Sequence, residues 1–441
     1  MGKITFMGAG STVFAKNVLG DSMLCEALCD FEMALYDIDA ERLEESYIMV
    51  TSMNRNINQN RAKITKYLGV ENRKEALRGA DFVVDAIQVG LYEPCTVIDF
   101  EVPKKYGLRQ TIADTLGIGG IFRALRTIPV LADFARDMEE VCPDAWFLNY
   151  TNPMAMLSGY MQRYTGVKTV GLCHSVQACS HGILNALGIP FTEPIYEKIA
   201  GINHMAWLLE LKSGDGTDLY PEIRRRAIAE LEKMPNTKHH DLVRYEYIRR
   251  LGYYCTESSE HNAEYNNLFI KSKYPELIDR YNIPLDEYPR RCINQIAGWK
   301  SQKENYLNDR VSHARTGEYA SYIMEAMVTD KPYKIGGNVL NRGVITNLPY
   351  DACVEVPCLV DGKGIHPTFV GELPLQLAAM NSSNIYPQML TIEAAHTMKK
   401  ETIYQAAKMD PHTGAQLSTD EIVALCDELF EAHEKAGYPI F

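Results

Sequence analysis

Two short segments near the middle of the chain contain side chains that can bind a metal ion. The segment VGLCHS places Cys173 beside His174, and the later segment AGINHMAWLLEL has Asn203 and His204 inside an apolar, strand-like run. By itself the pattern leaves three interpretations open: a buried thiol near a hydrogen-bonded core histidine, a redox cysteine, or a metal site. A structural zinc site needs four protein ligands, so these two donors favour an open catalytic site in which substrate oxygens complete the coordination.

Titratable side chains gather again in the segment TESSEHNAEY, where two imidazole or carboxylate groups could act as general acid and base. A cluster this polar on a helix is equally typical of a solvated face. We select Glu260 and His261 as candidate bases from a set that comprises Glu257, Glu260, His261, Glu264 and Tyr265.

A glycine-rich turn near the N-terminus predicts a dinucleotide site. An apolar strand at Ile4–Met7 is followed by Gly8, Gly10 and Ser11, and then by a helical pattern. In dinucleotide-binding folds the first glycine permits a tight turn, the second lets the backbone approach the pyrophosphate, and the helix N-terminus binds the anion. The motif is incomplete, because Val13 stands at the third glycine position, and an isolated GxG turn is weak evidence.

Asp37 strengthens this interpretation. It ends the apolar run FEMALYDID, which reads as a second strand. A carboxylate there accepts hydrogen bonds from both adenosine ribose hydroxyls and repels a 2′-phosphate, so NAD is favoured over NADP. Arg42 lies nearby and weakens that preference. The alternative is that Asp37 is only a turn residue.

Strands and helices alternate through the first half of the chain. Continuous apolar strands separated by helices are typical of a doubly wound parallel α/β sheet, whose ligands bind beyond the carboxyl ends of the strands. We therefore expect segments 88–91, 149–153 and 173–175 to converge on the nicotinamide end of the cofactor, with Asn149 as a cofactor contact. The further strands are predicted at 81–87, 145–150 and 168–173, with helices between them.

Length and composition set the broad class. A chain of 441 residues favours two domains, and we place the boundary between 1–195 and 196–441. A net charge of −12 argues against nucleic acid or an anionic membrane as partner. No apolar run reaches the ~18 residues of a membrane span, and the first residues do not form a signal peptide. With 11 cysteines and no CxxC pair, we expect reduced thiols and a cytoplasmic location.

Several motifs, taken in order along the whole chain, resemble those of glycoside hydrolase family 4: ITFMGAGST, DTLGIGGIFRALRTIP, NYTNPMA, VGLCHS and GINHM. The segments GYYCTESSEHNAEY, PLDEYPRRC, NLPYDACVEVPCLVD and MDPHT look most like the α-galactosidase branch. The resemblance implies an NAD-binding Rossmann domain similar to lactate and malate dehydrogenases, and a C-terminal α+β domain that completes the active site. It also implies a Mn²⁺ bound by Cys173 and His204, and a homodimer or homotetramer.

The family is an exception to the two-carboxylate chemistry of most glycosidases. Its scheme, as the resemblance implies it, begins with oxidation of the sugar at C3 by NAD⁺. A base then removes the C2 proton, Mn²⁺ stabilises the resulting enediolate through O2 and O3, and the C1 group is eliminated. Water adds at C1 and the hydride returns to C3, so no net oxidation occurs.

Site residues follow from the matching motifs. Asn152 matches the family's sugar-binding Asn, and Asp114 matches an acidic residue before a Gly-rich turn in which Ile118 replaces a common Pro. His174 stands where the phospho-glucosidase branch has an acidic Asp, and a histidine can act as the acid near neutral pH. The base remains a choice within 257–265.

The segment VGLYEPCTVIDF bears on the substrate. It has Cys95 and Thr96 where phosphosugar branches have an Arg, and a phosphate without such a donor would be poorly held. An unphosphorylated α-galactoside of the melibiose type is therefore preferred, with α-glucosides and α-galacturonides as alternatives. From other classes, a 2-hydroxyacid dehydrogenase would need a substrate-binding Arg and an Asp–His pair but no metal. A catalytically inactive NAD-binding sensor is the remaining alternative.

Overall fold

The computed structural model describes residues 2–233, 239–308 and 310–440. Six parallel strands lie side by side in the order β3-β2-β1-β4-β5-β6, which is the strand order of a Rossmann fold and confirms the predicted fold class. These strands are β1 (Lys3–Met7), β2 (Glu32–Asp37), β3 (Lys63–Leu68), β4 (Phe82–Asp85), β5 (Trp146–Asn149) and β6 (Lys168–Leu172).

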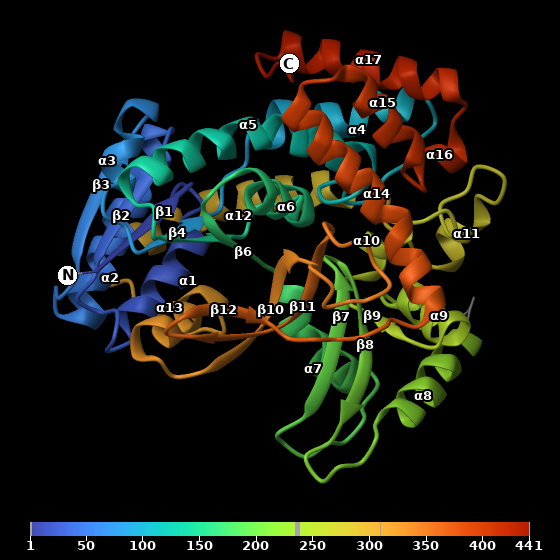
Figure 1. Ribbon diagram of the computed structural model, residues 1–441, viewed down its shortest axis with the longest axis horizontal. Helices are drawn as coiled ribbons and strands as arrows, with labels where there is room; N and C mark the ends of the chain where they lie inside the picture. The colour runs from blue at the N-terminus through green and yellow to red at the C-terminus, as the bar shows by residue number, and fades with distance from the viewer. Residues whose placement is uncertain (1, 234–238, 309, 441) are drawn as a thin grey trace.

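The sheet does not end at β6. Strands from the second half extend it with antiparallel pairing in the order β10-β11-β7-β8-β9, and β12 pairs with β11. A single sheet therefore runs across the expected boundary at residue 195, as Figure 1 shows. These strands are β7 (Tyr196–Ile202), β8 (Met205–Lys212), β9 (Tyr254–Cys255), β10 (Tyr333–Leu340), β11 (Cys353–Asp361) and β12 (Gly364–Pro367).

Helices cover both faces of the parallel strands because alternate side chains point to opposite faces. Phe6 packs into one buried apolar cluster and Met7 into the other. The Phe6 cluster includes residues of α1 (Thr12–Met23), α2 (Ala40–Asn58), α7 (His174–Ala186), α8 (Tyr220–Glu232), α9 (Leu242–Leu251) and α13 (Tyr319–Thr329). The Met7 cluster includes residues of α3 (Arg73–Leu77), α4 (Val97–Lys105), α5 (Gly117–Val141), α6 (Met154–Tyr164), α15 (Lys400–Met409) and α17 (Thr419–Lys435).

The long helix α14 (Leu375–Thr397) contributes to both clusters and so connects the two sides. In Figure 1, α5, α15 and α17 lie above the parallel strands β1 and β4, and α1 and α13 lie below them. The remaining helices are η1 (Val70–Asn72), η2 (Leu91–Thr96), α10 (Ser259–Glu264), α11 (Glu276–Arg280), α12 (Glu287–Leu307) and α16 (Thr413–Gln416). Among the described residues, none of the helices combines the length and hydrophobicity that crossing a bilayer requires.

Two expectations about strands are corrected. Asn203 and His204 do not lie within a strand; they form the turn between β7 and β8, where His204 has a φ of 62°. The strand β3 was not predicted, because its sequence KITKYL lies at the sheet edge, is only partly buried and has lysines at exposed positions. Edge strands often include such charges, which weakens the apolar pattern.

Candidate active site

A cavity of about 430 Å³ lies beyond the carboxyl ends of β1, β4, β5 and β6, where open α/β sheets bind ligands. Its walls come from both halves of the chain. The lining residues are Ser11, Phe14, Ala86, Ile87, Gln88, Asp114, Arg123, Tyr150, Thr151, Asn152, Met154, Leu172, Cys173, His174, Ser175, His204, Glu257, His261 and Tyr288. The three segments expected to converge, after β4, β5 and β6, therefore do so.

Cys173 and His204 face each other in this cavity together with a carboxylate. One ligand atom each from Cys173, His204 and Glu257 lies within 4.8 Å of the others, and Asp114, His204 and His261 form a second such group. His204 belongs to both groups. A thiolate, an imidazole and a carboxylate are a donor set that suits a divalent cation, so the residues present fit the metal that the sequence predicts.

The fold orients both principal donors. Cys173 precedes α7, and its sulfur accepts a hydrogen bond from the backbone N–H of Ser175 at 3.4 Å. The positive end of a helix stabilises a thiolate. The His204 ring lies with Nδ1 3.2 Å from the Tyr265 hydroxyl and Nε2 3.5 Å from Glu257 Oε2.

The electrostatics of these groups favour positive charge at His204. Burial lowers the pKa of this imidazole, but Cys173 and Glu257 outweigh that effect and raise it to about 10. Burial likewise opposes ionisation of Glu257, yet His261 and His204 lower the pKa of Glu257 to about 2. A site that stabilises an imidazolium without metal would also stabilise a cation bound there.

The segment TESSEHNAEY is buried, so its interpretation as a solvated face is wrong. His261, Glu264 and Tyr265 are 6%, 3% and 1% exposed. Glu260 is not among the cavity-lining residues; its carboxylate forms an ion pair with Arg291. Glu257, which precedes α10, lines the cavity instead.

His261 is held beside that carboxylate. Its Nδ1 lies 2.6 Å from the hydroxyl oxygen of Ser258 and 3.5 Å from Glu257 Oε1. Burial lowers the pKa of His261, although Glu257 acts in the opposite direction. The contacts at Nδ1 leave Nε2 for an interaction with a ligand in the cavity.

Asp114 follows a turn whose backbone is hydrogen-bonded to the Glu264 side chain. The Glu264 carboxylate accepts three backbone N–H bonds, from Thr111, Ile112 and Ala113, at 2.7, 3.2 and 2.8 Å. Burial raises the pKa of Glu264 to about 7 even though these donors act against it. Asp114 follows directly, lines the cavity and accepts a bond from the Thr115 hydroxyl at 2.7 Å.

The glycine-rich turn has the shape expected for a dinucleotide. Gly8 has a φ of +81°, and a Cβ there would lie 2.8 Å from a backbone oxygen of the β4 end. The Gly10 N–H donates to Asp37 Oδ2 at 2.6 Å, which ties the turn to the end of β2. Ser11 lines the cavity at the N-terminus of α1. A Cβ on Gly10 would lie 2.8 Å from Asp37 Oδ2, so a glycine is needed where the turn packs against the end of β2.

The two asparagines at and after the end of β5 differ. Asn152 lines the cavity, as expected. Asn149 is fully buried, and its amide bonds Ser158 Oγ at 3.0 Å and the Thr151 carbonyl at 3.2 Å. Asn149, expected as a cofactor contact, does not line the cavity, and its amide instead shapes the loop that presents Thr151 and Asn152.

Arg123 is a cavity residue that sequence reasoning missed. It lies on α5 and is 7% exposed, and it donates to the Asn152 carbonyl at 3.1 Å and to the Tyr288 hydroxyl at 3.2 Å. Burial opposes its charge, but Tyr288 and Asp114 raise the pKa of Arg123 above its usual value. An arginine inside the apolar helical run IFRALRTIPVL was the available signal.

His174 lies at the edge of the cavity with a partner from the second half. Its Nε2 is 2.5 Å from Glu318 Oε1, immediately before α13. Hydrogen bonding to Glu318 raises the pKa of His174, while burial lowers it. The pair therefore favours the protonated imidazole.

Fold and cavity together define a Rossmann-type protein whose cavity is completed by residues of the second half, among them His204 and Glu257, which could bind a metal ion with Cys173. The chain belongs to family 4 of the glycosyl hydrolases: the family model matches residues 3–189, and the model of its C-terminal domain matches residues 199–413.

Among curated relatives, the chain is 61% identical over 434 residues to an α-galactosidase of Bacillus subtilis, covering 98% of both chains. It is 28% identical to an α-galacturonidase of Thermoanaerobacter italicus over 97% of this chain and 96% of that one. A solved 6-phospho-α-glucosidase from gut microorganisms, in complex with NAD and Mn²⁺, has the same fold. Its TM-score is 0.77 at 19% identity, with 99% of each chain covered.

Proposed function

We propose that this protein is an NAD- and Mn²⁺-dependent α-galactosidase acting on unphosphorylated α-galactosides. The observation that supports it most is the single cavity in which the glycine-turn residue Ser11 and the donors Cys173, His204 and Glu257 meet. The 61% identity to an α-galactosidase, against 28% to an α-galacturonidase, favours the galactoside.

Each cofactor has matching residues. Gly8, Gly10, Ser11 and Asp37 would hold NAD, and Cys173 and His204, with Glu257 in reach, would hold the cation. When bound, NAD would supply a hydride acceptor for C3 of the sugar, and the cation would supply a Lewis acid for its O2 and O3 oxygens.

The chain's own side chains bind and orient the sugar. Asn152, Arg123 and Tyr288 line one part of the cavity and offer amide, guanidinium and hydroxyl groups to the sugar hydroxyls. Arg123 and Tyr288 are bonded to each other, so both are held in place before substrate arrives. Preorganised donors of this kind reduce the entropic cost of binding.

Proton transfers fall to two histidines. His261, bonded at Nδ1 to Ser258, presents Nε2 to the cavity and is our candidate to take the C2 proton. His174, hydrogen-bonded to Glu318, is our candidate to protonate the leaving oxygen at C1. Asp114 adds a carboxylate within the same group as His204 and His261, and Glu257 replaces Glu260 as the second candidate base.

The wider properties form part of the same proposal. The substrate is a small-molecule glycoside, and the net charge of −12 disfavours nucleic acid as a partner. We place the enzyme in the cytoplasm as a homodimer or homotetramer. We also retain the division at 195/196, with cofactor residues before it and His204, Glu257 and His261 after it.

One experiment tests the reaction type. Hydrolysis of a nitrophenyl α-galactoside is run in D₂O with NAD⁺, Mn²⁺ and a thiol reductant. Removal of the C2 proton predicts product galactose with deuterium at C2, whereas direct displacement at C1 leaves C2 unlabelled. A 3-deoxy galactoside should not react. Normal hydrolysis of that substrate without C2 label would reject the proposal.

A second measurement fixes the class of substrate. A panel of nitrophenyl α-galactoside and α-glucoside, each with and without a 6-phosphate, together with nitrophenyl α-galacturonide, should show turnover of the unphosphorylated α-galactoside at the highest kcat/KM. Accumulation of NADH with a 2-hydroxy acid would instead indicate a dehydrogenase. No turnover of any glycoside, with intact NAD⁺ binding, would indicate a sensor.

A further inference from the structure

Glu355 is a buried carboxylate that no step of the proposed reaction uses. It lies on β11, is 1% exposed and forms no ion pair within the described part of the chain. Its Oε1 accepts two amide hydrogen bonds, from Asn338 at 2.8 Å and from Asn203 at 3.3 Å. A buried carboxyl group is costly to ionise: burial raises the pKa of Glu355, and the Asn338 amide, the His204 imidazole and the Asn203 amide offset this only in part.

The two amides belong to the two segments that present the metal donors. Asn203 immediately precedes His204 in the β7–β8 turn. Asn338 donates a second bond to the Gly171 carbonyl at 3.3 Å, two residues before Cys173. Glu355 is therefore one hydrogen bond from the His204 segment and two from the Cys173 segment.

The register of the sheet places these residues in one row. Gly171 of β6 pairs with Asn338 of β10, Asn338 pairs with Glu355 of β11, and Glu355 pairs with Gly201 of β7. The approach is close at its first step, since a Cβ on Gly171 would lie 2.8 Å from the Asn338 Cβ. The row runs from the parallel strands of the sheet to the β7–β8 hairpin, whose turn includes His204.

The hydrogen bond between Asn203 and Glu355 lies next to a strained backbone position, His204. His204 has a φ of 62°, a left-handed conformation that is unfavourable for a non-glycine residue. Such conformations persist where surrounding contacts determine them. The Asn203–Glu355 bond anchors the residue directly before His204.

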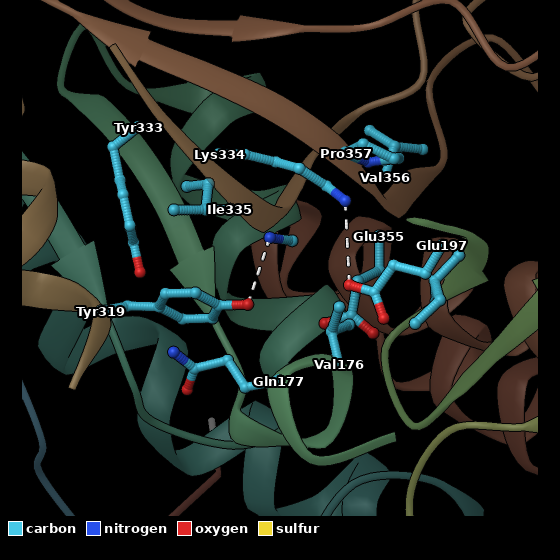
Figure 2. A pocket seen from close by; sticks show the side chains of 12 residues that line it. Val176, Gln177, Glu197, Tyr319, Tyr333, Lys334, Ile335, Glu355, Val356 and Pro357 are labelled. Carbon is cyan, nitrogen blue, oxygen red and sulfur yellow. Dashed lines mark hydrogen bonds and ion pairs between the residues drawn. The ribbon is translucent and has the colours of Figure 1, made fainter. Parts of the chain in front are cut away.

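Glu355 also lines a second cavity, of about 210 Å³, together with Glu197, Tyr319 and Lys334 (Figure 2). The cation there, Lys334, lies 3.8 Å from Glu197, and the Tyr319 hydroxyl accepts a bond from the Gly336 N–H at 3.3 Å. Glu355 Oε2 has no hydrogen-bond partner among the described residues. The two asparagine amides are thus the contacts through which this side chain acts.

We propose that Glu355 is a positioning residue that sets the spacing of Cys173 and His204 through Asn338 and Asn203, and thereby the affinity for the divalent cation. The inference rests on the proposed metal site. Groups that orient metal ligands through hydrogen bonds typically change metal affinity by about 10–100-fold when removed.

The test measures Mn²⁺ binding directly, by the loss of the free-ion electron paramagnetic resonance signal during titration of the full-length protein. Glu355→Leu keeps the volume and removes the acceptor, so the Mn²⁺ Kd should rise about 10-fold or more. Glu355→Gln keeps an acceptor oxygen for both amides and places its NH₂ where Oε2 has no donor. It should stay within about threefold of the wild type. Asp137→Asn is the matched control, a buried carboxylate paired with Arg73 that should leave the Kd unchanged.

The outcomes separate the two levels of the argument. An unchanged Kd in Glu355→Leu overturns the inference while leaving the metal site intact. A wild type that binds no Mn²⁺, or a Cys173→Ser variant that binds it equally well, rejects the proposed function itself. If Glu355→Leu does not fold, Asn338→Ala takes its place, since it removes one of the two connections. It should weaken binding several-fold, and an unchanged Kd there also overturns the inference.

Discussion

The glycine-rich turn and the donor group around His204 lie in the same cavity but are built in different ways. The turn is local: Gly10 donates to Asp37 at 2.6 Å, and all its parts lie within the first two strands and one helix. The donor group is assembled from the start of α7, the β7–β8 turn and the segment before α10. A local motif keeps its shape through its own backbone, whereas an assembled one depends on packing between distant segments.

The largest effect should come from the assembled group. Cys173→Ser and His204→Ala each remove a metal donor, so activity should fall by more than about 100-fold, beyond what loss of an orienting contact costs. Both variants should also lose Mn²⁺ binding and keep NAD⁺ binding, which equilibrium dialysis can measure separately. Retention of full activity in Cys173→Ser, or in the wild type with a strong chelator, contradicts the assignment.

Oxidation provides a reversible version of the same change. In the proposed site Cys173 binds the metal as a thiolate, so mild oxidation should inactivate the wild type, and a thiol reductant with Mn²⁺ should restore it. The other cysteines are also buried within the described structure. The oxidised enzyme should therefore lose Mn²⁺ binding and keep NAD⁺ binding, and loss of both would indicate damage elsewhere.

The two acids before and within α10 allow a sharper comparison. Glu257 lines the cavity within reach of His204, whereas Glu260 is bound to Arg291 outside the lining. Glu257→Gln should therefore lower kcat by about 10–100-fold. Glu260→Gln removes a partly exposed ion pair, worth at most about 1 kcal/mol, and should lower kcat by less than about threefold. If steady-state kinetics show the same fall in kcat for Glu257→Gln and Glu260→Gln, then the position of Glu257 in the cavity lining does not give it a special role.

This pair also shows what sequence reasoning could reach. Motifs identified Cys173 and His204, and strand–helix alternation predicted the parallel sheet. Spacing did not separate Glu257 from Glu260, because Glu257 has a φ of 63° just before α10, where helical periodicity does not apply. Arg123 was missed because its hydrogen-bond partner, the Asn152 carbonyl, comes near only when α5 packs beside the cavity. The sequence of an apolar helix does not reveal that partner.

Asn149 illustrates the same limit in the local region. It ends β5, so its position in the sequence indicated the crevice. Side chains alternate along the strand, and that of Asn149 points into the protein, where its amide oxygen Oδ1 accepts a hydrogen bond from the N–H of Thr151 at 2.9 Å. Strand ends are predictable from sequence, but which polar residue at a strand end faces the cavity depends on the final register.

The local turn should respond more mildly and more specifically. Asp37→Ala removes the acceptor for the ribose hydroxyls, worth about 1.5–3 kcal/mol for a charged hydrogen bond, so NAD⁺ affinity should fall by about 10–100-fold. Discrimination against NADP⁺ should relax, while the Mn²⁺ Kd stays unchanged. Fluorescence titration with both nucleotides measures this. Unchanged NAD⁺ affinity would make Asp37 structural and Asp39 the candidate.

Asp85, which ends β4 between the two regions, should affect stability rather than chemistry. It is fully buried, and burial raises the pKa of Asp85 to about 7. The unfolded chain loses this proton near pH 3.9, so between that value and pH 7 the folded state binds more protons and stability falls as pH rises. From pH 5 to pH 8 the loss from this group is about 3 kcal/mol. Asp85→Asn does not titrate, so its melting temperature should fall by a few degrees less over that interval than that of the wild type. Equal falls in melting temperature for the two proteins would show that Asp85 is ionised in the folded state at pH 5.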